Sequence, residues 1–228
     1  MIEDCKAVIF DMDGLMIDSE SIVIRAIQCA GETMGLQISE ELCFHMIGRS
    51  SKLVKESLYA EFGDDFPLKE FFLQVQKNAT RFVEKNGIAL KTGLKELIRT
   101  LEDAAVLKAV GTSSSRKNTE LKLKKTRLYE HFNTVVCGDE VDHSKPAPDI
   151  YLKVARQLKL EPRECVVLED SEPGIQAASA AGMIPIMVPD LHSPSEKLLP
   201  LIHQVFPTLH EVKIYLSKNM KVLQMISE

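Results

Sequence analysis

The sequence predicts an α/β protein with a Rossmann-like parallel sheet, helices on both faces of that sheet, and an inserted all-helical domain. Three observations carry this prediction. Short apolar runs of strand length recur along the chain, helical patterns separate most of them, and one long helical stretch follows the first run. Runs that are apolar throughout suit strands buried on both faces. Strands that alternate with helices form parallel sheets through right-handed crossovers.

Five apolar runs bounded by polar or turn residues are predicted to be strands: residues 7–10, 106–110, 134–137, 165–168 and 184–188. Between the later strands the apolar residues recur at helical spacing. These predicted helices cover residues 93–102, 117–125, 150–158 and 174–181. The final segment, 216–228, is amphipathic, and we expect it to pack on the sheet domain.

The stretch after the first strand is predicted to be entirely helical. Its four helical patterns cover residues 22–34, 39–46, 52–62 and 68–83. Ser39, which two glutamates follow, suits a helix N-cap, and Pro67 suits a helix start. An all-helical insertion after one strand of an α/β domain is typical of a lid or cap. We therefore expect a core domain of residues 1–18 and 89–228 and a helical cap domain of residues 19–88.

Composition narrows the class of protein. The 228 residues include 28 Lys and Arg against 33 Asp and Glu, which gives a formal charge of -5. The chain therefore lacks the excess of basic residues that binding a nucleic acid requires, and no such partner is expected. The five cysteines are scattered and form no CxxC pair, so the sequence shows neither a zinc-binding motif nor a disulfide framework. No leader-like N-terminus or membrane-length apolar run is present in the sequence. These features predict a cytoplasmic protein.

Chemically active side chains follow four of the predicted strands, where open α/β sheets place their sites. In chain order they are Asp11 and Asp13, a row of hydroxyls at 112–115, Lys145, and the pair Glu169 and Asp170. Each feature alone has an ordinary explanation: an Asp-Gly turn, a helix N-cap or a solvated charge. Together they suit a divalent hard cation, which carboxylates bind, and a phosphoryl group, which hydroxyl and ammonium groups bind.

These four motifs closely resemble those of the haloacid dehalogenase superfamily. In order they are Asp11-Met12-Asp13-Gly14, Ser113, Lys145 with Pro146, and Glu169-Asp170. The resemblance extends over the chain to about residue 216 and is to subfamily I, the phosphatase and phosphomutase branch with a helical cap. The segments 144–149 and 168–171 are most similar to the β-phosphoglucomutase-like phosphatase group.

The resemblance implies a Mg²⁺-dependent phosphomonoester hydrolase. Asp11 would attack phosphorus and form an aspartyl-phosphate, and Asp13 would act as general acid and then general base. Mg²⁺ would be held by Asp11, the backbone carbonyl of Asp13, and Asp170. Glu169 is expected to be either a further ligand or a group that orients metal-bound water.

The resemblance also implies which residues bind the phosphoryl group. Ser113 and Lys145 would contact its oxygens, and Ser114 would assist. Thr112 replaces Ser113 in this role if the register of the hydroxyl motif is one residue different.

Substrate choice is expected to depend on the cap. Ser19 and Glu20 lie at the hinge between core and cap, and Arg49 lies in a segment that resembles the family's specificity loop. The ordinary alternatives are that Ser19 caps a helix and that Arg49 is a surface charge. The expected substrate is a small phosphorylated metabolite, such as a sugar phosphate or a nucleotide-like ester, and the expected state is a monomer.

Two other activities and one non-catalytic function are the alternatives to a phosphatase. A hexose-phosphate mutase of the β-phosphoglucomutase type has a cap histidine where this chain has Val23, and a cap arginine where it has Ser51. Arg49 lies near that position and could replace the arginine after a shift of the loop, so the mutase stays an alternative. A dehalogenase lacks the second aspartate, which Asp13 supplies here. A non-catalytic protein that binds a phosphorylated ligand would have lost Asp11 or Asp13, and both are present.

Overall fold

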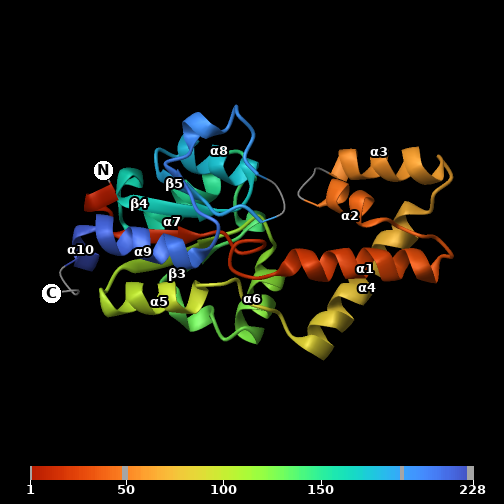
Figure 1. Ribbon diagram of the computed structural model, residues 1–228, viewed down its shortest axis with the longest axis horizontal. Helices are drawn as coiled ribbons and strands as arrows, with labels where there is room; N and C mark the ends of the chain where they lie inside the picture. The colour runs from red at the N-terminus through yellow and green to blue at the C-terminus, as the bar shows by residue number, and fades with distance from the viewer. Residues whose placement is uncertain (1, 48–50, 191–192, 225–228) are drawn as a thin grey trace. The chain divides into compact units, whose positions relative to one another are not determined.

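A computed structural model describes residues 2–47, 51–190 and 193–224, with the side chains of residues 51 and 52 left out (Figure 1). The chain divides into two compact units. The first contains Met1–Ile17 and Ala89–Glu228 and holds the sheet, and the second is Asp18–Ile88 and is helical. Among the described residues, no helix combines the length and apolarity that crossing a membrane requires.

The first unit is built on one parallel sheet with the strand order β3-β2-β1-β4-β5-β6. Its strands are β1 Ala7–Phe10, β2 Leu107–Gly111, β3 Thr134–Val136, β4 Cys165–Glu169, β5 Ile184–Met187 and β6 Gln204–Val205. The predicted fold class is therefore confirmed. The sequence did not predict β6, because its two residues are exposed at the sheet edge and form no apolar run.

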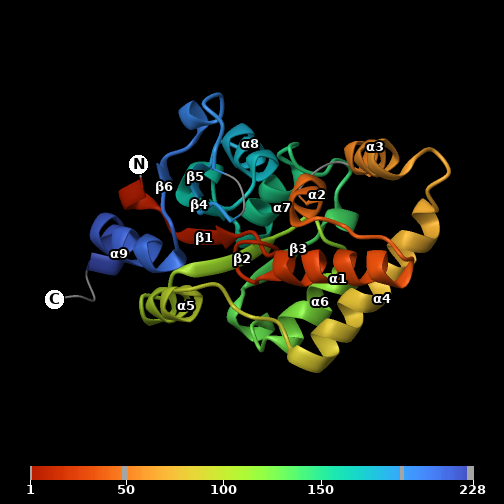
Figure 2. The same cartoon turned by 45° about the vertical axis from the view of Figure 1, so that its right-hand side comes forward.

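Helices cover both faces of this sheet, with α7 and α8 on one face and α5 and α9 on the other (Figure 2). The helices of the unit are α5 Leu94–Asp103, α6 Arg116–Lys125, α7 Asp149–Leu158, α8 Glu172–Ala180, α9 Leu209–Asn219 and α10 Lys221–Gln224. On the face covered by α7 and α8, alternate strand residues such as Ile9 and Val167 join Val154 and Ala178 in one buried cluster. Burial on both faces explains why the strands are apolar throughout.

The C-terminal part of the first unit forms two helices, α9 and α10. Helix α9 starts at Leu209, where Thr208 accepts a hydrogen bond from the N–H of His210. Leu209, Val212 and Leu216 are buried, and α9 packs along α5. Met220 and Leu223 are buried as well, so the described residues of the amphipathic segment, 216–224, pack on the sheet unit as expected.

The register of the strands explains where the polar residues gather. Phe10 of β1 pairs with Val110 of β2 on one side and Leu168 of β4 on the other. The residues that follow these three therefore come side by side at the carboxyl edge of the sheet. They are Asp11, Gly111 and Glu169.

The second unit consists of α1 Ser19–Thr33, α2 Glu40–Met46, α3 Ser51–Phe62 and α4 Leu68–Asn86. Helices α1 and α4 pack along each other, and Leu58, Phe66 and Phe71 lie in the unit's own apolar cluster. The Ser39 hydroxyl accepts a hydrogen bond from the N–H of Leu42, which confirms the predicted N-cap of α2. The four predicted helices are all present in this unit.

Candidate active site

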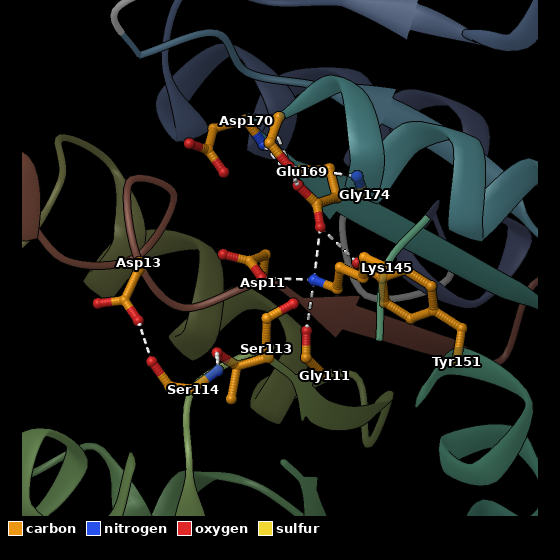
Figure 3. A network of polar contacts seen from close by, with 12 residues as sticks. Asp11, Asp13, Gly111, Ser113, Ser114, Lys145, Tyr151, Glu169, Asp170 and Gly174 are labelled. Atoms are coloured by element: carbon orange, nitrogen blue, oxygen red, sulfur yellow. Dashed lines mark hydrogen bonds and ion pairs between the residues drawn. The ribbon is translucent and has the colours of Figure 1, made fainter. Parts of the chain in front are cut away.

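Asp11 and Asp13 point in different directions from the turn that follows β1 (Figure 3). The N–H of Asp11 donates to the Leu168 carbonyl at 3.0 Å, which extends the sheet by one residue, and Asp11 is only 7% exposed. Gly14 then adopts a φ of 85°, a conformation that glycine tolerates best. The turn therefore separates the two carboxylates.

Lys145 joins the ends of three strands. Its Nζ lies 2.5 Å from Asp11 Oδ1, 2.6 Å from Glu169 Oε1 and 2.9 Å from the Gly111 carbonyl oxygen. The ammonium also lies 4.8 Å from the ring centre of Tyr151. Since its side chain is only 5% exposed, Lys145 is a fixed buried cation and not a solvated surface charge.

The carboxylate of Glu169 is saturated with hydrogen bonds. Oε1 accepts from Lys145 Nζ and, at 2.6 Å, from the Tyr151 hydroxyl. Oε2 accepts from the N–H of Asp170, the N–H of Ser171 and the Ser171 hydroxyl. Glu169 is fully buried. A carboxylate so fully engaged by the protein suits an orienting role better than direct metal coordination.

Gly174 makes room for this carboxylate. A Cβ atom at position 174 would lie 1.8 Å from Glu169 Oε1 and 1.9 Å from its carboxyl carbon. Gly174 lies in the first turn of α8, and its N–H donates to the Ser171 hydroxyl at 3.2 Å. The close approach of helix and carboxylate therefore requires glycine at this position.

Three acidic residues form a cluster that fits a divalent cation. One carboxylate oxygen from each of Asp11, Glu169 and Asp170 lies within 4.8 Å of the others. Oxygen donors of this type suit hard cations such as Mg²⁺. Lys145 pairs with two members of the cluster, so the negative charge exceeds what this lysine neutralises. The residues present thus fit a metal, with Asp11 and Asp170 as the side chains best suited to bind it.

Burial governs the ionisation of this cluster. Burial raises the pKa of Asp11 to about 7, an effect that the Lys145 ammonium opposes and the Glu169 and Asp13 carboxylates reinforce. Burial by itself would lower the pKa of Lys145, but Asp11 and Glu169 hold it well above its usual value. Lys145 therefore stays protonated at neutral pH.

Asp13 is held by two side chains from the segment after β2. Ser114 Oγ donates to Asp13 Oδ2 at 2.7 Å, and Lys122 Nζ lies 2.5 Å from Asp13 Oδ1. Figure 3 shows Asp13 directed at Ser114. Lys122 was not predicted from the sequence, because its helix is rich in lysine and has the pattern of a solvated surface.

The hydroxyl motif after β2 distinguishes Thr112 from Ser113. Thr112 is 1% exposed, and its hydroxyl accepts the N–H of Ser114 at 3.1 Å. Ser113 is exposed, and its hydroxyl accepts a hydrogen bond from Ser144 at 3.3 Å. Of these two residues, Ser113 is therefore the exposed one and Thr112 the buried one.

The predicted specificity residues lie at the start of the helical unit or outside the described residues. Ser19 and Glu20 are the first two residues of α1. The side chain of Asp18 accepts the N–H of Ser21, so Asp18 caps this helix and the alternative that Ser19 caps it is wrong. Arg49 lies outside the described residues.

Tyr151 is a further residue at the site that was not predicted from the sequence. Its hydroxyl donates to Glu169, and its ring faces the Lys145 ammonium. The helical pattern of α7 places Tyr151 among core residues, and a buried aromatic residue gives no sign of which polar group its hydroxyl will meet.

Comparison with known proteins identifies the family. The model of the haloacid dehalogenase-like hydrolase family matches residues 8–188. The chain is 31% identical to the phosphorylated carbohydrates phosphatase of Thermotoga maritima, over 78% of this chain and 82% of that protein. It is also 31% identical to the fructose-1-phosphate phosphatase of Escherichia coli, over 80% and 96% of the two chains.

A solved structure agrees with these matches. The HAD family hydrolase of Deinococcus radiodurans, determined with bound phosphate and sodium, is 28% identical and superposes with a TM-score of 0.80. The superposition covers 95% of this chain and 97% of that one. Together with the motif residues at the carboxyl edge of the parallel sheet, these matches mean that the chain belongs to the haloacid dehalogenase-like hydrolase family.

Proposed function

We propose that this phosphatase hydrolyses a small phosphorylated metabolite, such as a sugar phosphate or a nucleotide-like ester, through a phosphoryl group carried on Asp11. The observation that carries the proposal is the buried Asp11 carboxylate, which Lys145 holds by one oxygen inside an acidic cluster. The similar enzymes of Thermotoga maritima and Escherichia coli, whose names give phosphorylated carbohydrates and fructose 1-phosphate as substrates, support the substrate class.

In the first step a carboxylate oxygen of Asp11 attacks the phosphorus atom of the ester. The new bond forms as the bond from phosphorus to the leaving oxygen breaks, and the leaving oxygen takes the electron pair. Protonated Asp13 gives its proton to that oxygen, which releases an alcohol. The product on the enzyme is an aspartyl-phosphate at position 11.

In the second step a water molecule attacks the phosphorus of this aspartyl-phosphate. Asp13, now a carboxylate, accepts a proton from the water, and the Asp11 carboxylate departs with its electron pair. Inorganic phosphate leaves, and both aspartates return to their starting protonation states. Asp13 thus serves as acid and then as base in one cycle.

Lys145 and Ser113 hold the transferring phosphoryl group in this account. The Lys145 ammonium stays charged and fixed at the site, so it stabilises negative charge on the phosphoryl oxygens as Asp11 attacks. Ser113, an exposed residue, offers a further hydrogen bond through its hydroxyl. Ser114 contributes through its contact with Asp13.

We further propose Mg²⁺ as the metal, held by Asp11, the backbone carbonyl of Asp13 and Asp170. When bound, Mg²⁺ would neutralise charge on the phosphate oxygens and fix the ester for in-line attack. Glu169 orients the neighbouring groups through its own hydrogen bonds.

We expect the affinity for Mg²⁺ to fall as the pH drops below about 7. Burial raises the pKa of Asp11 to about 7 in the metal-free protein, and a cation binds the carboxylate form. Each pH unit below this value should weaken binding by about tenfold, and the affinity should level off above it. Titration calorimetry with MgCl₂ across this range measures the effect, and a pH-independent affinity would contradict the role of Asp11 as a ligand.

The proposal also covers the mutase alternative, the cap, the compartment and the oligomeric state. A mutase of the β-phosphoglucomutase type is not favoured, because the curated relatives named above are phosphatases. We also propose that residues 19–88 act as a cap in which Ser19, Glu20 and Arg49 select the substrate. We also propose that the protein is a cytoplasmic monomer that binds no nucleic acid.

Phosphate release from a panel of esters tests the proposed function. The panel contains fructose 1-phosphate, glucose 1-phosphate, glucose 6-phosphate, a nucleoside monophosphate and p-nitrophenyl phosphate. We expect release that requires MgCl₂ and that EDTA abolishes. No release from any ester would contradict the proposal, and conversion of glucose 1-phosphate to glucose 6-phosphate with a bisphosphate primer would favour the mutase instead.

A further inference from the structure

Each carboxylate oxygen of Asp13 is contacted by one side chain that follows β2, which leaves each oxygen a second lone pair. Oδ1 pairs with Lys122 Nζ at 2.5 Å, and Oδ2 accepts from Ser114 Oγ at 2.7 Å. Ser114 lies in the loop after β2. Lys122 lies on α6, more than one turn after the start of that helix. Two anchors on two oxygens fix both the position and the rotation of the carboxylate.

Stability alone does not account for this arrangement. The side chains of Asp13 and Lys122 are 30% and 26% exposed, and a partly exposed ion pair contributes little to folding. Lys124 on the same helix differs: it is 60% exposed and pairs with Glu120 one turn earlier. Lys122 instead reaches from α6 to the turn after β1, so its contact fixes a group whose location matters to the chemistry.

We infer that Lys122 is a positioning residue for the proton transfers of Asp13, acting together with Ser114. This inference rests on the proposed function, in which Asp13 donates a proton to the leaving oxygen. Lys122 holds the Asp13 carboxyl at one place beside the reacting ester. Without this anchor the carboxyl rotates among several rotamers, and only a fraction of molecules present the proton correctly.

The leaving group of the ester separates this role from a purely structural one. An alkyl phosphate, such as a sugar phosphate, needs a proton on its leaving oxygen. The p-nitrophenolate ion leaves without a proton, so its release is insensitive to where Asp13 lies. The value of kcat/KM reports the steps up to release of the leaving group. A positioning defect therefore lowers kcat/KM for the alkyl ester alone.

The test compares Lys122→Met, Lys122→Arg and the control Lys124→Met. The substrates are the alkyl phosphate that the wild type hydrolyses fastest in the panel and p-nitrophenyl phosphate. We expect Lys122→Met to lower kcat/KM for the alkyl ester by about 10- to 100-fold and for the nitrophenyl ester by less than about threefold. Lys122→Arg, which keeps the cation, should recover part of the loss, and Lys124→Met should match the wild type.

An equal loss with both esters would overturn the inference, because it indicates a general structural role. Unchanged kcat/KM with both esters would overturn it as well. Thermal unfolding of each variant identifies a folding defect. If Lys122→Met has such a defect, Ser114→Ala, which removes the other contact to Asp13, is compared with the wild type on the same two esters. A wild type that hydrolyses no ester contradicts the proposed function itself and so is distinguishable from these outcomes.

Discussion

Asp11→Asn should lower phosphatase turnover by at least about 10³-fold, because an amide cannot attack phosphorus as a carboxylate does. Asn preserves the shape of the side chain and can still accept a hydrogen bond from Lys145 Nζ, which lies 2.5 Å from Asp11 Oδ1. The loss should therefore arise in the chemical step. Phosphate release with saturating MgCl₂ and the best ester of the panel measures it.

The same variant should remain folded. A carboxyl whose pKa is raised in the folded state binds its proton more tightly there than in the unfolded chain. Its contribution to stability therefore falls as the pH rises from the ordinary value of 3.8 towards about 7. In EDTA at a pH above 7, the Tm of Asp11→Asn should be no lower than that of the wild type.

The control Asp103→Asn, at an exposed carboxylate at the end of α5, should retain full activity. Near-normal turnover by Asp11→Asn would exclude Asp11 as the nucleophile.

Gly174→Ala should lower both the stability and the metal-dependent activity. The added Cβ would lie 1.8 Å from Glu169 Oε1. Glu169 cannot move aside easily, since its oxygens accept hydrogen bonds from Lys145, Tyr151 and the backbone of Asp170. We expect a destabilisation of about 3 kcal/mol, a fall in Tm of about 6 to 12 °C, and weaker binding of MgCl₂.

Gly182→Ala is the matched control for this variant. Gly182 follows α8, at the opposite end of the helix from Gly174, and has a φ of 75° with no atom closer than 4.0 Å to a built Cβ. Its substitution costs the strained backbone conformation, about 1 to 2 kcal/mol, and leaves Glu169 untouched. Equal activity and equal MgCl₂ affinity of the two alanine variants would show that the contact between Gly174 and Glu169 is unimportant.

The strand ends could be predicted from the sequence because an apolar run limits where a buried strand stops. The run at β1 ends immediately before Asp11, and the run at β4 ends at Leu168, immediately before Glu169. Parallel strands place their carboxyl ends at one edge, so these residues had to meet. The same reasoning failed for β6, Gln204–Val205, which is short, exposed and without an apolar run.

The contacts made across the site could not be predicted in the same way. Lys122 lies 109 positions from Asp13 in the chain, and its lysine-rich helix carries no pattern that selects one lysine over the others. The apolar ring of Tyr151 fits the buried face of α7. The sequence pattern therefore explains Tyr151 as a core residue and does not reveal the hydrogen bond from its hydroxyl to Glu169. Spacing alone also left open whether Glu169 binds metal, because the answer depends on how many hydrogen bonds the folded protein gives its oxygens.

Detection of the phosphorylated residue tests the central claim of this account most directly. The wild type is mixed with the best ester, quenched within one turnover, and treated with borohydride, which reduces an aspartyl-phosphate to homoserine. Mass spectrometry of the peptide that contains residues 7–14 then locates the change. We predict homoserine at position 11, with Asp13 unmodified. Homoserine at another position, or phosphate release with no modified enzyme at any quench time, would contradict the account.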